Sequence, residues 1–406
     1  APVRYVYASV AIVVCLTFYL YKMEMEFIFC RFSNPSVGPH VRVEPMKPEY
    51  RYKNISALWN AMDRLISNLS LYPDGEFVDE AIAALRNARI IRADMWGARV
   101  STSYKWQLTL EGGQKVLFKP AIVNITNKER TSDCVSGCEH PQYEITGFAL
   151  NRLFKLKNMP YATGRRLSWA NEIEPVATDA LLNATIVLED GDVCVKWACY
   201  QMRPKTYCFK KGVIEGAIIY WLENRIVRER YQSKGTAHHE FHVRGRRLDE
   251  FKTLMTGEKD FCQEFRQIQT YRKNITFGHV LDMAVLDYIM LNYDTKHTYI
   301  AQNYSKAVIN LNIIVDYGLS FCPVDDVILL APIYQCCNIR RKIYDALLMH
   351  QFNFTKVFLT ATSDDPLFPL LLEQDVIDMH NRLHTILALV TICMNKYGEE
   401  GVVLDI

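Results

Sequence analysis

Residues 276–321 read TFGHVLDMAVLDYIMLNYDTKHTYIAQNYSKAVINLNIIVDYGLSF and hold a helix pattern followed by a strand pattern. The apolar residues of the first part recur at helical spacing, at Val280, Leu281, Ala284, Val285, Tyr288 and Ile289. This pattern stops at Asn292, and Asp294 follows it. Residues 307–315, which are rich in Val and Ile, then predict a strand that leads directly to Asp316.

The two aspartates are spaced as phosphoryl transfer requires. A buried helix leads to one of them and a strand leads to the other about twenty residues later. In such sites one carboxylate orients the acceptor hydroxyl, and the other holds the metal on the triphosphate. Aspartate is also a common turn residue. The two aspartates therefore indicate a catalytic site only if candidate partners for them occur elsewhere in the chain.

The bulk composition is that of a large globular protein. The chain has 406 residues, of which 50% are hydrophobic and 12% aromatic, which allows a sizeable core. The formal net charge is +2, which argues against a dedicated nucleic-acid binder and against a polybasic membrane patch. We therefore expect no nucleic acid among its partners.

The N-terminal segment has a different composition. Residues 5–21 are uncharged and apolar, between Arg4 and Lys22, and their length is at the lower limit for a spanning helix. The positive charge on the N-terminal side predicts a cytoplasmic tail and a lumenal body. We interpret residues 1–22 as the tail and an uncleaved signal anchor, followed by a lumenal stem over 23–84. A cleaved signal peptide and a buried helix of a soluble domain are the alternatives.

Glycosylation sequons support the secretory route. They occur at Asn54, Asn68, Asn124, Asn183, Asn274, Asn303 and Asn353. The 12 cysteines support it as well, because several stand in tight groups, at Cys134 and Cys138, at Cys194, Cys199 and Cys208, and at Cys336 and Cys337. Disulfides are the default interpretation in an oxidising compartment. A zinc site is the rival, but the groups lack paired CxxC spacing.

Two further segments contribute candidate site residues. Residues 106–120 read WQLTLEGGQKVLFKP, which predicts a hairpin with a Gly-Gly turn and places Lys119 near the end of its second strand. Residues 141–156 show helical spacing, with Glu144 in the first turn. An ion pair between a strand lysine and a helix glutamate fixes the lysine on the phosphates in kinase sites. A surface lysine and a glutamate that favours the helix dipole are the ordinary alternatives.

Several blocks of the sequence resemble the secretory-pathway kinases called "family with sequence similarity 20", and within it the xylose kinase branch. The similar blocks are LEGGQKVLFKP at 110–120, YEITGFALNRLF at 143–154, EPVATDALL at 174–182, GVIEGAIIYWL at 212–222, LDMAVLDYIMLNYD at 281–294 and LLAPIYQCCNIR at 329–340. The resemblance extends from about residue 85 to the C-terminus.

The resemblance implies a role for each candidate residue. Lys119 would contact the nucleotide phosphates, and Glu144 would pair with it and help to hold the metal. Asp294 would be the catalytic aspartate, and Asp316 the metal-binding aspartate. ATP and Mn²⁺ (or Mg²⁺) are the implied cofactors.

The resemblance also implies a fold and a cellular role. The fold is α+β, an atypical two-lobed protein-kinase-like fold over 85–406, with an N-lobe at 85–220 and a C-lobe at 221–406, behind the signal anchor. The activity is transfer of the ATP γ-phosphate to a xylose hydroxyl in the glycosaminoglycan-linkage oligosaccharide of proteoglycans. The location is the Golgi membrane, as a single-pass type II protein with a lumenal catalytic domain, anchored in the membrane through residues 1–22. A family pseudokinase or a second copy of the chain would be its protein partner.

The cysteine pairing follows from the resemblance as well. It implies disulfides between Cys194 and Cys208, between Cys262 and Cys336, and between Cys337 and Cys393. Met202 stands where the family has a partner for Cys199, so Cys199 is either free or paired with Cys134 or Cys138.

The sequence departs from the family beside the catalytic aspartate. Residues 294–299 read DTKHTY, where the family pattern resembles Asp-Arg-His-His-Tyr-Glu, so only Asp294 and His297 match. Residues 320–322 read Ser-Phe-Cys in place of Ser-Phe-Gly. Because the four groups with direct roles all remain, we expect an active enzyme. A pseudokinase that regulates an active relative and a secretory-pathway kinase acting on Ser of proteins are the alternatives.

Overall fold

The structure is a computed structural model, and it describes residues 54–67, 70–96, 104–122, 139–197, 205–222, 226–228, 262, 274–292, 298–302, 308–321 and 329–406. These residues belong to one compact unit, 48–406. The predicted signal anchor lies outside them. Among the described residues, no helix is long and apolar enough to cross a membrane.

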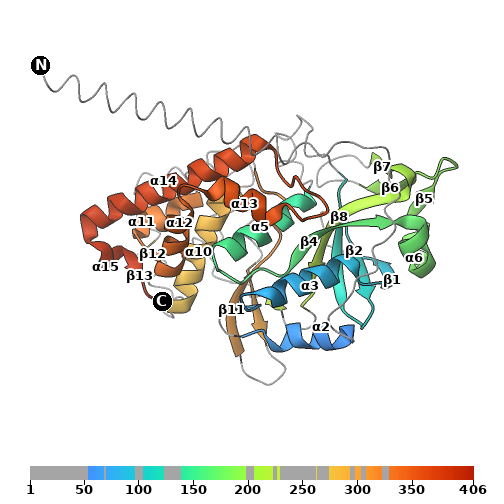
Figure 1. Cartoon of the computed structure of the whole chain (residues 1–406), viewed down its shortest axis with the longest axis horizontal. Helices are drawn as coiled ribbons and strands as arrows, with labels where there is room; N and C mark the ends of the chain where they lie inside the picture. The colour runs from blue at the N-terminus through green and yellow to red at the C-terminus, as the bar shows by residue number, and fades with distance from the viewer. Residues whose placement is uncertain are drawn as a thin grey trace, which may run out of the picture. The chain divides into compact units, whose positions relative to one another are not determined.

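A five-stranded antiparallel sheet forms the first half of this unit, in the order β1-β2-β3-β8-β4 (Figure 1). The strands are β1 (Ile90–Met95), β2 (Trp106–Leu110), β3 (Lys115–Pro120), β4 (Ala162–Ser168) and β8 (Val213–Tyr220). The predicted hairpin is confirmed, since β2 pairs with β3. Its turn requires glycine, because Gly112 and Gly113 have φ angles of 82° and 90°.

One face of the sheet is covered by the predicted helix α5 (Pro141–Leu153), which packs on β4 and β8. The strands come close together beneath it. A Cβ at Gly216 in β8 would lie against the carbonyl oxygen of Lys119 and 2.6 Å from Cζ of Phe118. Phe118 is buried and stacks on Trp106, with ring centroids 5.6 Å apart. The position of β3, and with it Lys119, therefore depends on this tight contact.

The second half of the unit is helical. Its helices are α10 (Asn274–Met290), α11 (Ala331–Cys336), α12 (Arg341–His350), α13 (Phe354–Thr362), α14 (Glu373–Tyr397) and α15 (Glu399–Val402). Every residue from Gly278 to Met290 is buried, as expected of a helix in which most positions are apolar. Helix α10 packs on α14 and α11, and α13 joins the halves by packing on both α14 and α5.

Two smaller sheets complete the fold. Strands β9 (Ile226–Arg228), β10 (Thr298–Gln302) and β11 (Val308–Ile314) form an antiparallel sheet, and β11 is the predicted strand that leads to Asp316. Strands β5 (Thr185–Val187), β6 (Val193–Trp197) and β7 (Lys205–Phe209) form another sheet, preceded by the short helix α6 (Asp179–Asn183). In the helical half, β12 (Ile339–Arg340) and β13 (Val403–Leu404) form a two-stranded parallel pair that packs on α12.

The described residues contain three disulfides, and they are the three that the resemblance implies. Cys194–Cys208 joins β6 to β7, Cys262 bonds Cys336, and Cys337–Cys393 joins the end of α11 to α14. Each bond of this kind stabilises a fold by about 2–4 kcal/mol. Cys134, Cys138 and Cys199 lie outside the described residues.

The folded unit begins earlier than the sequence predicted. Helices α2 (Ile55–Arg64) and α3 (Glu76–Asn87) fall in the predicted stem, yet both pack in the sheet half of the unit. Trp59 Nε1 donates to the carbonyl oxygen of Glu111 at 2.8 Å, and the Tyr220 hydroxyl donates to Asp63 at 2.8 Å. The boundary at residue 85 is therefore wrong. An amphipathic helix needs a surface on which to bury its apolar face, and here the sheet half provides it.

The contact at Gly216 generates a stability prediction. Gly216→Ala should lower the free energy of unfolding by about 1–3 kcal/mol, because the added methyl group must push β3 away from β8. Urea denaturation of the oxidised protein measures this change. Gly401→Ala is the matched control, since its Cβ would lie at an ordinary 3.5 Å from Tyr397, and its effect should stay within about 0.5 kcal/mol. Equal effects of the two substitutions would contradict the account of the sheet.

Candidate active site

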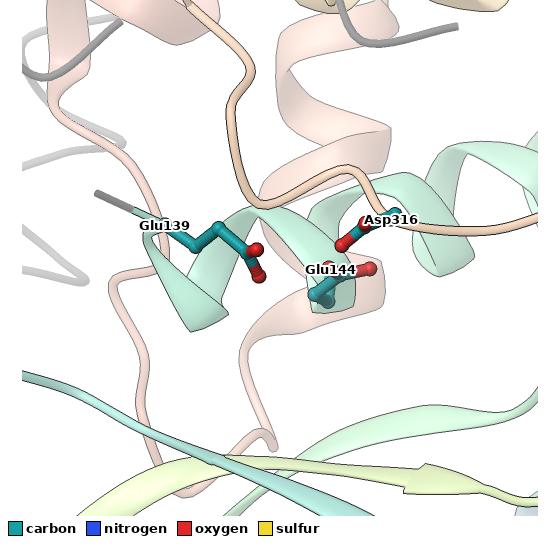
Figure 2. A group of neighbouring side chains, drawn as sticks. All are labelled: Glu139, Glu144 and Asp316. Carbon is teal, nitrogen blue, oxygen red and sulfur yellow. The ribbon is translucent and has the colours of Figure 1, made fainter. Parts of the chain in front are cut away.

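The site is built around the ammonium group of Lys119, which β3 carries into the interior. Lys119 is only 4% exposed. Its Nζ donates to three carboxylates, to Glu139 Oε2 at 2.6 Å, to Glu144 Oε1 at 2.5 Å and to Asp316 Oδ1 at 2.6 Å. A buried ammonium needs such partners, because an unpaired charge is very costly to desolvate. Glu139 and Glu144 come from the segment at the start of α5, and Asp316 comes from the segment after β11, so two segments converge on one point (Figure 2).

Glu144 is held in place by the backbone as well as by Lys119. It lies in the first turn of α5, and its two carboxylate oxygens accept hydrogen bonds from the amides of Tyr317 and Gly318, each at 3.1 Å. Asp316 makes this approach possible, because its φ of 70° turns the chain sharply after β11. Aspartate tolerates this left-handed conformation better than most residues. The glutamate therefore joins the strand lysine to the segment that carries the second aspartate.

Glu139 is a site residue that the sequence analysis missed. It stands directly before His140, the N-cap of α5, whose amide donates to the carbonyl oxygen of Gly318 at 2.8 Å. Gly318 must be small, since a Cβ there would lie 2.8 Å from Cβ of Glu139. A single acidic residue before a helix is a weak signal. Only its spacing of five residues before Glu144 hinted at a shared site.

Lys105 is a second missed residue, and it completes the charge distribution of the site. Its Nζ lies 3.5 Å from Glu139 Oε1 and 3.9 Å from Asp316 Oδ1. Burial by itself would lower the pKa of Lys119, but the carboxylates of Asp316, Glu139 and Glu144 outweigh it and hold that pKa well above its usual value. Lys119 therefore remains charged at neutral pH, and two positive groups face three negative ones.

The carboxylates form a donor set that suits a divalent cation. Glu139, Glu144 and Asp316 each offer an oxygen, and these oxygens lie within 4.8 Å of one another. Hard cations such as Mg²⁺ and Mn²⁺ prefer carboxylate oxygen ligands. The residues therefore fit the metal that phosphoryl transfer requires, with Lys119 beside it.

The structure brings together three of the four residues predicted from sequence. Lys119, Glu144 and Asp316 meet within hydrogen-bonding distance. Asp294 lies outside the described residues, and so do Thr295, Lys296 and His297.

Comparison with known proteins decides the family. The family described as "Golgi casein kinase, C-terminal, Fam20" matches residues 57–402. The chain belongs to the Fam20 family. Among its Fam20 relatives, glycosaminoglycan xylosylkinase of Danio rerio is 29% identical over 354 residues, covering 86% of this chain and 83% of the relative. Glycosaminoglycan xylosylkinase of Homo sapiens is 29% identical over 328 residues, covering 79% of this chain and 76% of the relative.

Solved structures confirm the Fam20 kinase-like fold with its mixed helices and sheets. A structure of hydra Fam20 with sugar aligns with a TM-score of 0.69 at 22% identity, covering 86% of this chain and 98% of that one. A structure of the Golgi casein kinase with Mn/ADP bound aligns with a TM-score of 0.68 at 20% identity, covering 86% of this chain and 85% of that one. The prediction of a kinase-like α+β fold is thereby confirmed.

The carboxylate set of this Fam20 protein generates a prediction about metal binding. Glu139→Gln, Glu144→Gln and Asp316→Asn should each weaken Mn²⁺ binding by about tenfold or more, because each removes a charged oxygen from the cluster. Titration calorimetry in the presence of ADP measures the affinity. Glu215→Gln, which changes a half-exposed carboxylate paired with Arg166, is the control and should leave the affinity unchanged. An unchanged affinity in Glu139→Gln would remove Glu139 from the metal site.

Proposed function

We propose that this protein transfers the γ-phosphate of ATP to a xylose hydroxyl in the glycosaminoglycan-linkage region of proteoglycans, using Mn²⁺ (or Mg²⁺). The observation that carries the proposal is the buried cluster of Lys119 with Glu139, Glu144 and Asp316. The names of the similar relatives support the acceptor. The Golgi casein kinase structure with Mn/ADP bound supports the cofactors.

Each residue of the cluster has a physical task in this reaction. Lys119 donates to phosphate oxygens and keeps its charge because the carboxylates stabilise it. Glu144 fixes the direction of the lysine, since its other hydrogen bonds come from rigid backbone amides. Glu139, Glu144 and Asp316 supply the oxygens that hold the metal. The metal, when bound, neutralises charge on the phosphate oxygens as the phosphoryl group moves.

Asp294 would orient the acceptor and receive its proton. The acceptor oxygen forms a bond to the γ-phosphorus while the bond from that phosphorus to the bridging oxygen of ADP breaks. The hydroxyl proton passes to the Asp294 carboxylate. The departures from the family pattern at Thr295, Lys296, Thr298 and Tyr299 leave this proton acceptor in place, so the minimum set of groups for transfer is present in the sequence.

We also propose that the protein works in the Golgi lumen as a single-pass type II membrane protein. The apolar residues 5–21 behind Arg4 support an anchor. The three disulfides of the described part support an oxidising compartment.

The catalytic assignment predicts the behaviour of an Asp294 variant. Asp294→Ala should abolish phosphate transfer to a xylose-containing linkage oligosaccharide but retain binding of Mn·ADP, because it removes the proton acceptor and leaves the carboxylate cluster intact. Full-length protein with radiolabelled ATP and Mn²⁺ provides the assay. Asp345→Ala, at an exposed position on α12, is the control and should retain full activity.

Parallel acceptors separate the alternatives. Transfer to casein but not to the oligosaccharide would replace the proposal with a protein kinase. Binding of Mn·ADP without transfer to either acceptor would indicate a pseudokinase, and the departures from the family pattern beside Asp294 would then explain the loss of activity.

A further inference from the structure

Two functional segments of the chain meet on one buried carboxylate, that of Asp287. Its Oδ1 accepts a hydrogen bond from the Tyr317 hydroxyl at 2.9 Å and another from Nδ2 of Asn292 at 3.0 Å. Asp287 is only 2% exposed and lies in the last turn of α10. Tyr317 directly follows Asp316, and Asn292 stands two residues before Asp294.

We propose that Asp287 is a positioning residue, which fixes the metal-binding segment and the start of the catalytic segment relative to each other. The inference rests on the proposed kinase function. Asp287 touches neither nucleotide nor acceptor in this scheme, and it acts through Tyr317 and Asn292. Phosphoryl transfer depends on such placement, since its catalysis is largely positioning and electrostatics.

The end of α10 holds these segments through its backbone as well. The amide of Phe321 donates to the carbonyl oxygen of Met290 at 2.6 Å, and the amide of Asn292 donates to the carbonyl oxygen of Asp287 at 2.8 Å. Arg382 from α14 donates its Nε to the carbonyl oxygen of Ile289 at 2.9 Å. The last carbonyls of a helix have no partner within the helix, and here the two segments and α14 supply partners. Tyr317 and Phe321 thus attach both ends of residues 317–321 to one helix end.

Tyr317 connects this helix end to the lysine cluster. Its amide donates to Glu144 and its hydroxyl donates to Asp287, so one residue joins the two groups of interactions. The ring is fully buried, and Gly147 of α5 leaves room for it, because a Cβ there would lie 3.2 Å from Cγ of Tyr317.

Substitutions of Asp287 and Tyr317 test the proposal, with a substitution of Asp282 on α10 as the matched control. Asp287→Leu and Tyr317→Phe should each lower kcat by about 10- to 100-fold, as is typical when a group that orients a ligand is removed. Asp287→Asn should recover much of this loss, because an amide oxygen can still accept both hydrogen bonds. Asp282→Leu is the control. Asp282 is equally buried on the same helix, but its Oδ2 accepts from Nη1 of Arg340 at 2.6 Å, and Arg340 is not a residue of the site.

The melting temperature separates positioning from folding. Asp282→Leu and Asp287→Leu should both lower it, but only Asp287→Leu should lower kcat of the folded fraction. A kcat within twofold of wild type in Asp287→Leu and Tyr317→Phe would overturn the inference and leave the proposed function standing. An equal loss of kcat in Asp282→Leu would also overturn it. A wild-type protein that transfers no phosphate to any acceptor would overturn the proposed function itself, and this inference with it.

The exposed apolar side chains carry a second, independent inference. Of the thirteen large hydrophobic side chains that are exposed in the described part, seven lie within five residues of Asn183 or Asn353. Those beside Asn183 are Leu182, Ile186, Val187 and Leu188, and those beside Asn353 are Leu348, Met349 and Phe352, which is 80% exposed. Both asparagines are exposed and begin glycosylation sequons.

We infer that Asn183 and Asn353 carry N-linked glycans, and that these glycans cover the two apolar patches. The inference rests on the proposed secretory location. Exposed apolar patches on a soluble domain favour association, and a bulky hydrophilic glycan in the middle of a patch prevents it. Asn54 is also exposed and begins a sequon, but it has no such apolar neighbours in the described part. The exposed large hydrophobic side chain nearest to it in sequence there is Leu65, eleven residues away.

Glycopeptide mass spectrometry of the protein secreted from animal cells tests occupancy, and dye binding tests the coverage. Asn183 and Asn353 should be modified. Asn183→Gln, Asn353→Gln and glycosidase-treated wild type should all bind more of a hydrophobic dye and form larger species on size exclusion. Ser56→Ala, which removes the Asn54 sequon, should do neither. Unmodified Asn183 and Asn353, or dye binding no greater than in Ser56→Ala, would overturn the inference.

Discussion

The structure depends on one buried ammonium group. Lys119 is separated in sequence from its carboxylate partners Glu139, Glu144 and Asp316 by 20, 25 and 197 residues. A charge in the interior is stable only when its partners are held at hydrogen-bonding distance, and removing one partner of a buried pair typically costs about 3–5 kcal/mol. This requirement fixes β3, α5 and the segment after β11 against one another. The same arrangement leaves three carboxylate oxygens close enough to hold a metal.

The helical half provides the rigid support for this cluster. Helix α10 is buried on every side from Gly278 to Met290. Two disulfides through the adjacent Cys336 and Cys337 tie α11 to Cys262 and to α14. Because α10 cannot shift without disturbing this packing, its C-terminal end is a fixed point. The segment after Asp316 is attached to that end, and Asp294 follows it in sequence.

The sequence predicted the parts of the site whose signals are local or follow a known motif. The alternation and the Gly-Gly turn located the hairpin and Lys119, and helical spacing located Glu144. Glu139 and Lys105 could not be found in this way, because a single charged residue gains its partners only when distant segments fold together. The boundary at residue 85 failed for a related reason. The helical pattern of α2 is the same for a stem and for a domain, and only its tertiary contacts, those of Trp59 with Glu111 and of Asp63 with Tyr220, distinguish them.

A crystal structure with Mn²⁺ and ADP bound, with the manganese located by its anomalous scattering, tests the role of the Lys119 cluster. We expect a manganese peak in contact with carboxylate oxygens of Glu139, Glu144 and Asp316, with Lys119 on the ADP phosphates. A manganese ion elsewhere, or a nucleotide whose phosphates lie away from Lys119, would contradict it.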